Sequence, residues 1–227
     1  METHIGSRDC ARTARNDSDE KSVRIVDAEG HRKNILEVAT AEFAAHGFAG
    51  ARIDEIAAKT SCSKRMIYYY FVDKDGLYVA VLENAYRRVR QLEEAVDYDV
   101  LSPEAALRKL VAFRFSYHEK NAHFVKLVLN ENMNGAHHLA RSDVIVQLNQ
   151  LALATVDRIY ARGVHDRVFR PGISALEIHW QISAFCFYGV SNKSTFSTLF
   201  ERQISVGLSF DKIKANAVDS IMRFVIL

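Results

Sequence analysis

The spacing of apolar residues predicts helices along most of the chain. In the first third, Ile35, Ala39 and Phe43 recur every four residues and therefore share one face of a helix. Gly47 follows this stripe, and glycine tolerates the left-handed conformation in which many helices end. We expect the helix to end at Gly47, with Phe48 folding back onto its last turn.

Two short helices with a very short connection follow. The first has two isoleucines on one face. The second begins after Ser63, a good N-cap, and is expected to bury Ile67 and Phe71. Only three residues separate these helices, so they cannot lie antiparallel and must cross steeply. This geometry predicts a helix-turn-helix motif at about residues 52–71.

The remaining two thirds of the chain show helical patterns as well. A helix at about 75–95 leads into this part, and Ser102, Pro103 and Glu104 form an N-cap, an N1 proline and an N2 acid for the next one. Further helices are expected over residues 122–133, 142–162 (closed by Gly163), 174–190 and 210–225, with a short one at 194–201. Because the 227 residues include only two prolines, we expect an all-α fold.

These patterns divide the chain into three segments. Residues 1–28 are polar with a slightly acidic balance, and they predict a disordered tail. The arginines of this tail can reach a DNA minor groove, but the acidic balance favours an inert tail. Residues 29–89 are expected to form the three-helix helix-turn-helix domain, and residues 90–227 a larger helical domain.

Composition narrows the class of protein. The net charge of +2 is close to zero, so a nucleic-acid site requires a local basic cluster. The sequence has neither a long apolar run nor a signal peptide, so we expect a cytoplasmic protein without a membrane span. Cys10, Cys62 and Cys186 lie far apart and lack metal-ligand spacing. They predict free thiols, with a redox switch as the alternative, and neither a metal nor another cofactor is expected.

The second short helix carries an unusual set of side chains. The outward positions of this helix, together with one lysine just beyond its end, are basic or aromatic. They are Lys64, Arg65, Tyr68, Tyr69, Tyr70 and Lys74. Lysine and arginine donate hydrogen bonds to guanine edges and phosphates, and tyrosine contacts phosphates and thymine methyl groups. An ordinary solvated helix face is the alternative, but the helix-turn-helix spacing favours DNA binding.

Residues 31 to about 80 resemble the DNA-binding domain of the TetR family of bacterial regulators. The resemblance rests on RKNILEVATAEFAAHGF and IDEIAAKTSCSKRMIYYYFVDKDGLYVAVL, above all on the pattern S-K-x-x-[IL]-Y-x-[HY]-F-x-x-K-x-x-L. It implies that the helix beginning at Ser63 enters the major groove. The implied contacts are Lys64, Arg65 and Met66 to bases, Tyr68 and Tyr70 to bases or backbone, and Lys74 and Arg52 to phosphates.

Two positions depart from the family pattern. Arg52 stands where the family has a threonine that caps the first short helix, and arginine caps poorly. Ser61 stands where the family has a glycine in the turn. A left-handed serine there is expected to cost about 1 kcal/mol.

Polar residues within apolar stripes of the C-terminal domain indicate a small-molecule site. Arg114 and His118 share a helix face with leucine and valine, and Glu131 and Trp180 lie on comparable faces. We expect these four residues to line an effector pocket for a small, polar, planar molecule that Arg114 clamps. A simple ion pair between Arg114 and Glu131 is the alternative. The stretch LVLNENMNGAHHLARS also resembles the RutR-like subgroup of the family.

The last two long helices predict a homodimer. One carries Leu176, Trp180, Ala184 and Phe187 with Ile178, Ile182 and Phe185 on a second face, and the other carries Ile213, Ala217, Ile221 and Val225 with Val218 and Met222 on a second face. A helix that is apolar on two faces needs two partners, here the core and a symmetric copy. The sequence therefore favours a homodimeric repressor that a small molecule releases from a palindromic double-stranded DNA operator. A regulator without an effector and an all-helical enzyme are the alternatives, although no catalytic motif is present.

Overall fold

The computed structural model describes the backbone of residues 9–207 and 209–227 and the side chains of residues 28–200 and 209–227. Within these ranges the chain forms helices and turns, with one isolated bridge between Phe169 and Ile226. The elements are α1 (Asp9–Gly50), α2 (Ile53–Lys59), α3 (Lys64–Phe71), α4 (Lys74–Glu94), α5 (Pro103–Lys120), α6 (Ala122–Met133), the 3-10 turn η1 (Leu139–Arg141), α7 (Asp143–His165), α8 (Ala175–Ser191), α9 (Lys193–Gly207) and α10 (Phe210–Val225). The predicted all-α fold class is confirmed.

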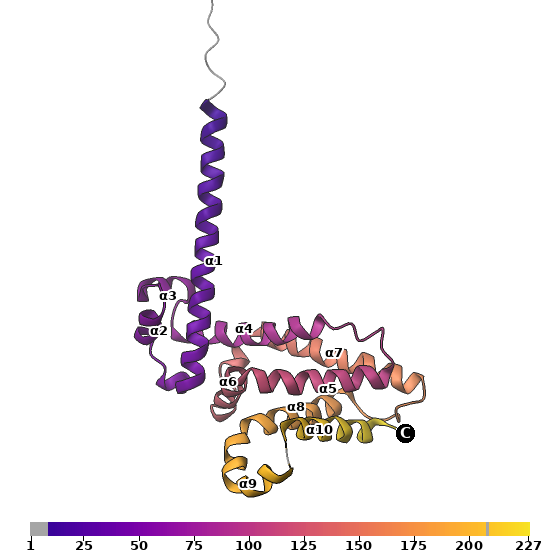
Figure 1. Cartoon of the computed structure of the whole chain (residues 1–227). Coiled ribbons are helices and arrows are strands. Elements are labelled where there is room, and N and C mark those ends of the chain that lie inside the picture. Colours follow the sequence, from indigo (N-terminus) through magenta and orange to yellow (C-terminus); the bar gives the residue numbers. More distant parts are fainter. Residues whose placement is uncertain (1–8, 208) are drawn as a thin grey trace, which may run out of the picture.

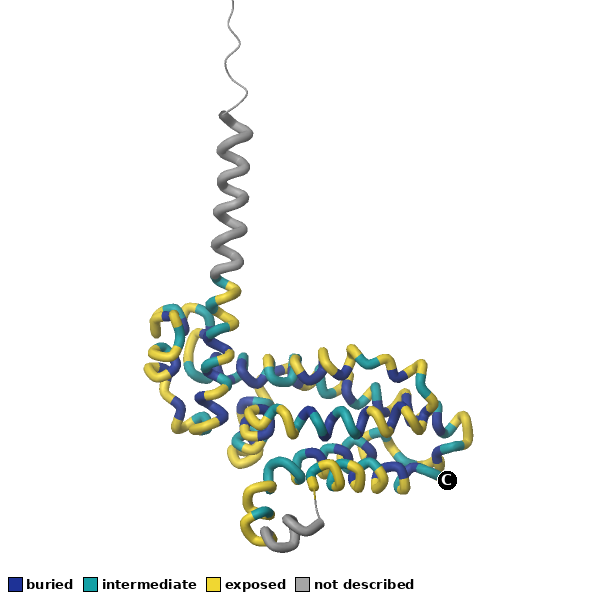
Figure 2. Tube along the Cα trace, viewed as in Figure 1, coloured by how far each residue is buried: buried dark blue, intermediate teal, exposed yellow. Residues whose placement is uncertain are grey.

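The helices form two groups that α4 joins. In Figure 1, α2 and α3 lie beside α1 at one end of the molecule, and α4 runs from this group into a bundle of the remaining helices. Helix α5 is central in the bundle, where it packs against α7, α8 and α10. Buried and exposed residues alternate along these helices, as expected for amphipathic helices around a core (Figure 2).

Helix α1 bends sharply at Gly47. This glycine has φ 67° and ψ 178°, the positive φ that the sequence predicted for a helix end. The ring of Phe48 then lies 6.4 Å from Phe43 and 5.2 Å from Tyr78, so the folding back of Phe48 is confirmed. This aromatic contact fixes the chain direction into the helix-turn-helix.

The N-terminal segment differs from the expected tail. Residues 1–8 lie outside the described residues, but α1 begins at Asp9, well inside the stretch for which the sequence predicted disorder. Residues 9–29 contain neither proline nor glycine, so nothing in the backbone chemistry of this stretch interrupts a helix that continues from the folded domain.

The apolar core of the N-terminal helices continues into the C-terminal bundle. The first cluster gathers the apolar faces of α1 to α4, including Phe43, Ile67 and Leu77, and it also takes in Leu127 from α6 and Ile145 from α7. A second cluster fills the C-terminal bundle. The domain boundary predicted at residues 89–90 falls inside α4, a continuous helix that contributes to both groups, and it stays a prediction.

Serine caps explain where the C-terminal helices begin. The hydroxyls of Ser102, Ser142, Ser174 and Ser209 each accept a backbone N–H of the helix that they precede.

The prediction that Gly163 closes α7 was wrong, because the helix continues to His165. Gly163 instead gives room to Phe169, whose ring lies 1.9 Å from where a Cβ atom would stand. Helix α9 also extends beyond the expected 194–201.

In the part of the chain that the structure describes, no helix is long and apolar enough to cross a membrane.

Cys62 and Cys186 are buried free thiols, and burial raises the pKa of the Cys186 thiol to about 12. A thiol held in its protonated form reacts slowly, so Cys186 is a poor redox switch.

Candidate functional site

The helix-turn-helix has the local chemistry that its sequence predicts. The Ser63 hydroxyl accepts the N–H of Met66 at 3.3 Å and so caps α3. Arg52 precedes α2 without a side-chain cap bond. In the turn, the Thr60 hydroxyl accepts the Cys62 N–H at 3.3 Å. The expected left-handed strain at Ser61 was wrong, since the positive-φ residues other than glycine in the described chain are at positions 72, 136 and 167. The Thr60 bond holds this turn without a left-handed residue.

The outward face of α3 is basic and aromatic. Lys64 and Arg65 are exposed, Tyr68 is 38% exposed, and Tyr69 is 82% exposed. Met66 and Tyr70, which the family pattern implied as DNA contacts, are partly buried and pack against the apolar core of the motif. Their freedom to contact DNA is therefore smaller than the sequence suggested, and Tyr69 is more available than either.

The cations around α3 differ in their pairing. Lys64 forms a 2.8 Å ion pair with Asp54 of α2, and this hydrogen bond raises the pKa of the Lys64 ammonium. The Lys74 ammonium lies 3.5 Å from the carbonyl oxygen of Ala49 and 4.9 Å from the centre of the Phe48 ring. No carboxylate among the described side chains forms an ion pair with Arg65, so Arg65 is free to bind a new acceptor.

A strained turn joins α3 to α4. Val72 has φ 68° and ψ −60°, and its side chain is 82% exposed. The N–H of Asp73 donates to the carbonyl of Phe71 at 2.7 Å, which closes a γ-turn around Val72. Gly76 is required here, because a Cβ atom would lie 2.2 Å from the Phe71 carbonyl oxygen. This tight junction sets the direction of α3 relative to α4.

The C-terminal bundle contains a cavity of ≈ 330 Å³, a volume that suits a small organic molecule. Its walls come from α4 to α8, and most of them are apolar or aromatic. The lining residues are Tyr86, Val89, Arg90, Arg114, His118, Phe124, Val128, Asn132, Asn149, His179, Trp180, Ile182, Ser183, Ala184, Cys186 and Phe187. The cavity thus brings together three of the four predicted effector residues, Arg114, His118 and Trp180.

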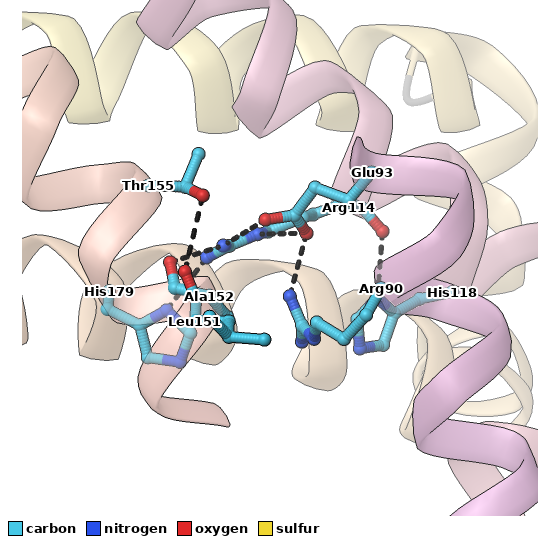
Figure 3. A network of polar contacts seen from close by, with 8 residues as sticks. All are labelled: Arg90, Glu93, Arg114, His118, Leu151, Ala152, Thr155 and His179. Atoms are coloured by element: carbon cyan, nitrogen blue, oxygen red, sulfur yellow. Dashed lines mark hydrogen bonds and ion pairs between the residues drawn. The ribbon is translucent and has the colours of Figure 1, made fainter. Parts of the chain in front are cut away.

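A buried charge network forms one side of this cavity (Figure 3). The carboxylate of Glu93, 3% exposed, accepts hydrogen bonds from Arg114 at 2.8 and 3.2 Å and from Arg90 at 2.8 Å. Arg114 also donates to the carbonyl of Ala152 at 3.2 Å and to Nδ1 of His179 at 2.7 Å. Arg114 is therefore held by protein groups on several sides.

The two cavity histidines are neutral and have opposite tautomers. The guanidinium of Arg114 only donates, so Nδ1 of His179 accepts and its Nε2 carries the proton. Nδ1 of His118 donates to the carbonyl of Arg114 at 2.7 Å, which leaves its Nε2 as an acceptor. Desolvation, with Arg114 and Arg90 nearby, lowers the pKa of His179 to about 4, and desolvation likewise lowers the pKa of His118.

Glu131 does not belong to the cavity. Its carboxylate is fully buried and accepts the backbone N–H groups of His138 and Leu139 at 3.0 and 3.1 Å. Nδ1 of His138 lies 3.1 Å from the same carboxylate, and Nε2 of His138 lies 3.4 Å from Asp75 at the start of α4. The predicted cavity position of Glu131 and its alternative pairing with Arg114 are therefore both wrong, because Glu131 points toward the DNA-binding domain.

Two family models match this chain. One, described as a tetracyclin repressor-like C-terminal domain, matches residues 103–221, and the other, described as bacterial regulatory proteins of the tetR family, matches residues 35–81. The HTH-type transcriptional repressor NicS of Pseudomonas putida is 33% identical over 194 residues, which are 86% of this chain and 90% of NicS. The chain belongs to the TetR family.

Other relatives place this TetR-family chain among DNA-binding transcriptional regulators. The HTH-type repressor SCO4008 of Streptomyces coelicolor is 36% identical over 107 residues, 47% of this chain and 52% of that protein. RutR of Escherichia coli is 42% identical over 62 residues, 27% of this chain and 28% of RutR. RutR is thus among the relatives of this chain, over a shorter stretch than NicS.

Solved structures of other transcriptional regulators share the fold. A transcriptional regulator from Saccharomonospora viridis, in complex with choline, has a TM-score of 0.68 and 18% identity and covers 88% of this chain and 99% of its own. FadR of Bacillus subtilis, in complex with stearoyl-CoA, has a TM-score of 0.62 and 14% identity and covers 85% of this chain and 96% of its own. At these identities the likeness concerns the fold alone.

The outer surface of the TetR-family bundle is apolar along α8. Leu176, Trp180, Ala184 and Tyr188 follow one another at four-residue spacing, and all four are exposed, while Ile178 and Ile182 are buried on the opposite side. Helix α10 does not have the second apolar face that the sequence suggested. Met222 is buried beside Ala217, Ile221 and Val225, so these residues form one wide stripe that faces the core.

Sequence reasoning missed three groups of this site. Arg90 and Glu93 belong to a helix that looked like a plain linker, although two opposite charges three residues apart on an amphipathic helix are a usable signal. His179 stands next to Trp180 in the sequence and lines the same cavity. No local signal connects His138 with Asp75, because their contact joins segments far apart in the chain.

Proposed function

We propose that this TetR-family regulator is a homodimeric repressor that leaves a palindromic operator when a small molecule enters the C-terminal cavity. The observation that carries this proposal is the position of α6. Val128 and Asn132 of α6 line the cavity, whereas Asn130 and Glu131 of the same helix contact the DNA-binding domain and η1. A ligand that displaces α6 thus acts on both sites at once.

Contacts between α6 and the DNA-binding domain give this coupling a physical route. The amide of Asn130 donates to the carbonyl of Phe43 in α1 at 3.4 Å. Glu131 holds His138, whose ring packs 4.3 Å from Phe48 and 4.8 Å from Tyr78. Because these are α1 and α4 residues, a shift of α6 changes the orientation of α3. The ligand favours the orientation in which two recognition helices miss successive major grooves.

The DNA contacts in this proposal come from the outward face of α3 and its flanks. Arg65 contacts bases, and Lys64 contacts bases after its ion pair with Asp54 breaks. Tyr68 and Tyr69 contact the DNA backbone or bases. Lys74 and Arg52 bind phosphates, and Ser63 caps the helix toward the groove. Met66 and Tyr70 act mainly through packing.

The exposed apolar stripe of α8 supports the homodimer. A monomer rarely leaves such a row of large apolar side chains in water, and Leu176 and Trp180 are 62% and 71% exposed. We propose that α8 supplies the apolar contact, and that α10, which packs beside α8, adds mainly polar contacts where the two helices meet the same pair of a second copy in a four-helix bundle. The twofold axis then sets two equivalent half-sites in the operator. Because the operator DNA of a bacterial regulator lies in the cytoplasm, we expect the protein to act there.

Gel shifts with DNA from upstream of the protein's own gene test the function. We expect a sequence-specific complex that a member of a small-molecule library releases. A specific complex that no compound in a broad library releases points to the regulator without an effector, and absence of any specific complex rejects the repressor. The relatives named repressors, and the fold neighbours with bound choline and stearoyl-CoA, support the expected outcome.

A further inference from the structure

The walls of the C-terminal cavity carry positive charge without a matching acid. Arg90 and Arg114 both line the cavity, and none of the described lining residues is acidic. Glu93 lies behind the two guanidinium groups and neutralises only one of them. Since His118 and His179 are neutral, this side of the cavity holds one net positive charge.

The surplus charge belongs to Arg90. Arg114 donates four hydrogen bonds, to Glu93, Ala152 and His179. The side chain of Arg90 is only 10% exposed, and among the described residues it forms one hydrogen bond, from Nη1 to Glu93. Its Nε atom is buried without a partner. Figure 3 shows the two guanidinium groups on different sides of the Glu93 carboxylate.

An underused guanidinium in this place is costly. Burial of an ion is unfavourable unless good geometry and full hydrogen bonding offset the lost hydration. Arg90 has one 2.8 Å hydrogen bond and a buried Nε without a partner, so its hydrogen bonding is incomplete. Desolvation also lowers its pKa. An anion that enters the cavity supplies the missing partner and balances this charge.

We propose that the effector of this protein is a small organic monocarboxylate with a flat apolar body, and that Arg90 binds its carboxylate. This inference rests on the proposed function of the cavity. The planar fork of arginine matches a carboxylate with two parallel hydrogen bonds. The Nε2–H of His179 is a second donor in the same cavity, and Phe124, Phe187 and Trp180 supply flat apolar walls for the body of the ligand.

The charge balance selects a monoanion. One carboxylate leaves the site neutral, whereas a phosphate dianion adds a negative charge that no described lining residue offsets. A cationic ligand adds to the positive charge already present. In this scheme Arg114 is a positioning residue, because its hydrogen bonds to Glu93 and His179 hold those groups beside Arg90. The expectation that Arg114 itself clamps the ligand is revised accordingly.

Trp180 provides the measurement. It is the only tryptophan in the chain and it lines the cavity, so its fluorescence responds to occupancy. Because Trp180 also lies on the exposed stripe of α8, the protein concentration is held constant and sedimentation confirms that the oligomeric state does not change during the titration. The full-length protein is titrated with benzoate, phenylacetate and 4-hydroxybenzoate, and with the primary amide of each acid. We expect saturable changes with at least one acid, and binding weaker by roughly tenfold to a hundredfold for its amide.

The same titration is repeated with Arg90→Met, Arg90→Lys and the control Arg88→Met, which removes an exposed arginine from the same helix. Arg90→Met is expected to lose affinity for the acid by a similar factor, Arg90→Lys to keep part of it, and Arg88→Met to match the wild type. Without ligand, the melting temperature of Arg90→Met should equal or exceed that of the wild type, because the uncompensated charge is gone.

Three results overturn the proposal: equal affinity for acid and amide, unchanged acid affinity in folded Arg90→Met, or no response of Trp180 to any of the acids. A melting temperature of Arg90→Met well below the wild type also counts against it, because Arg90 is then a structural partner of Glu93. These outcomes are independent of DNA binding. Release of DNA by a neutral or cationic compound leaves the repressor function intact and rejects only the carboxylate.

Discussion

His138 Nδ1 lies 3.1 Å from a carboxylate oxygen of Glu131, a side chain with no exposed surface. Glu131 also accepts two backbone N–H groups, so its three partners all come from the segment that begins η1. His138 in turn lies within ion-pair distance of Asp75 in α4. This short chain of contacts ties the cavity helix α6 to the first turn of the helix that follows α3.

Glu131→Gln is expected to lower the free energy of unfolding by about 2 kcal/mol, because an amide nitrogen replaces one acceptor among buried donors. Urea unfolding at neutral pH measures this change. Glu94→Gln, an exposed glutamate on α4, is the matched control and should stay within about 0.5 kcal/mol of the wild type. Equal stability of both variants contradicts the role of Glu131.

Arg65→Ala is expected to cost about 1–3 kcal/mol of operator affinity and to relax base preference at one position of each half-site. Lys74→Ala should weaken binding to all sequences alike and reduce the salt slope by about one per protomer. Fluorescence anisotropy at several salt concentrations separates the two effects. The control Lys109→Ala, which removes an exposed lysine on α5, should bind DNA as the wild type does. Wild-type affinity of both Arg65→Ala and Lys74→Ala rejects the assigned DNA face.

Val72→Gly is expected to raise the free energy of unfolding by about 1 kcal/mol, because glycine adopts φ 68° without strain. The valine side chain is 82% exposed, so little apolar burial is lost. Thermal unfolding measures the gain. Val100→Gly, at another exposed valine, lacks the positive φ and should be neutral or destabilised. Destabilisation of Val72→Gly contradicts the strained turn.

Acid should destabilise the wild type through His179. Its folded-state pKa of about 4 lies below the ordinary value of 6.5, so the unfolded chain binds more protons between these values. Stability therefore falls as the pH drops from 6.5 toward 4, by about 3 kcal/mol at most. His179→Gln should flatten this dependence in urea titrations at several pH values. His118 contributes in the same direction and remains in the variant, so part of the slope persists; an unchanged slope contradicts the prediction.

Tyr188→Glu is expected to weaken the dimer, because it places a charge on the exposed apolar stripe of α8. Sedimentation velocity at micromolar concentration should show a shift from dimer to monomer. Val100→Glu adds the same charge in the α4–α5 connection, away from the stripe, and should remain dimeric. A wild type that sediments as a monomer, or a Tyr188→Glu variant as dimeric as the wild type, removes α8 from the interface.

The sequence predicted the helix-turn-helix well because its signals are local. The stripe ending at Gly47, the cap at Ser63 and the short connection between two helices each act within a few residues. The same holds for the serine caps and for most helix bounds in the C-terminal domain. The prediction at Ser61 failed because a side-chain hydrogen bond of Thr60 supplied another turn geometry.

The cavity was harder to predict because its pairings are distant in the sequence. Periodicity showed that Arg114 and Glu131 face inward, but it does not tell which of two apolar cores a residue faces. The partner of Arg114 is Glu93, and the partner of Glu131 is His138, across a turn between α6 and η1. For α10, a wide apolar stripe on one face resembled two separate faces.

Selection of bound sequences from random double-stranded DNA by the purified full-length protein tests the central claim most directly. A homodimeric TetR-family repressor with α3 in the major groove should enrich one palindromic sequence whose half-sites are about one helical turn, or a multiple of it, apart. Arg65→Ala should enrich a palindrome that is less specific at one base pair in each half. Enrichment of a single unrepeated site, or of no sequence above background, contradicts the claim.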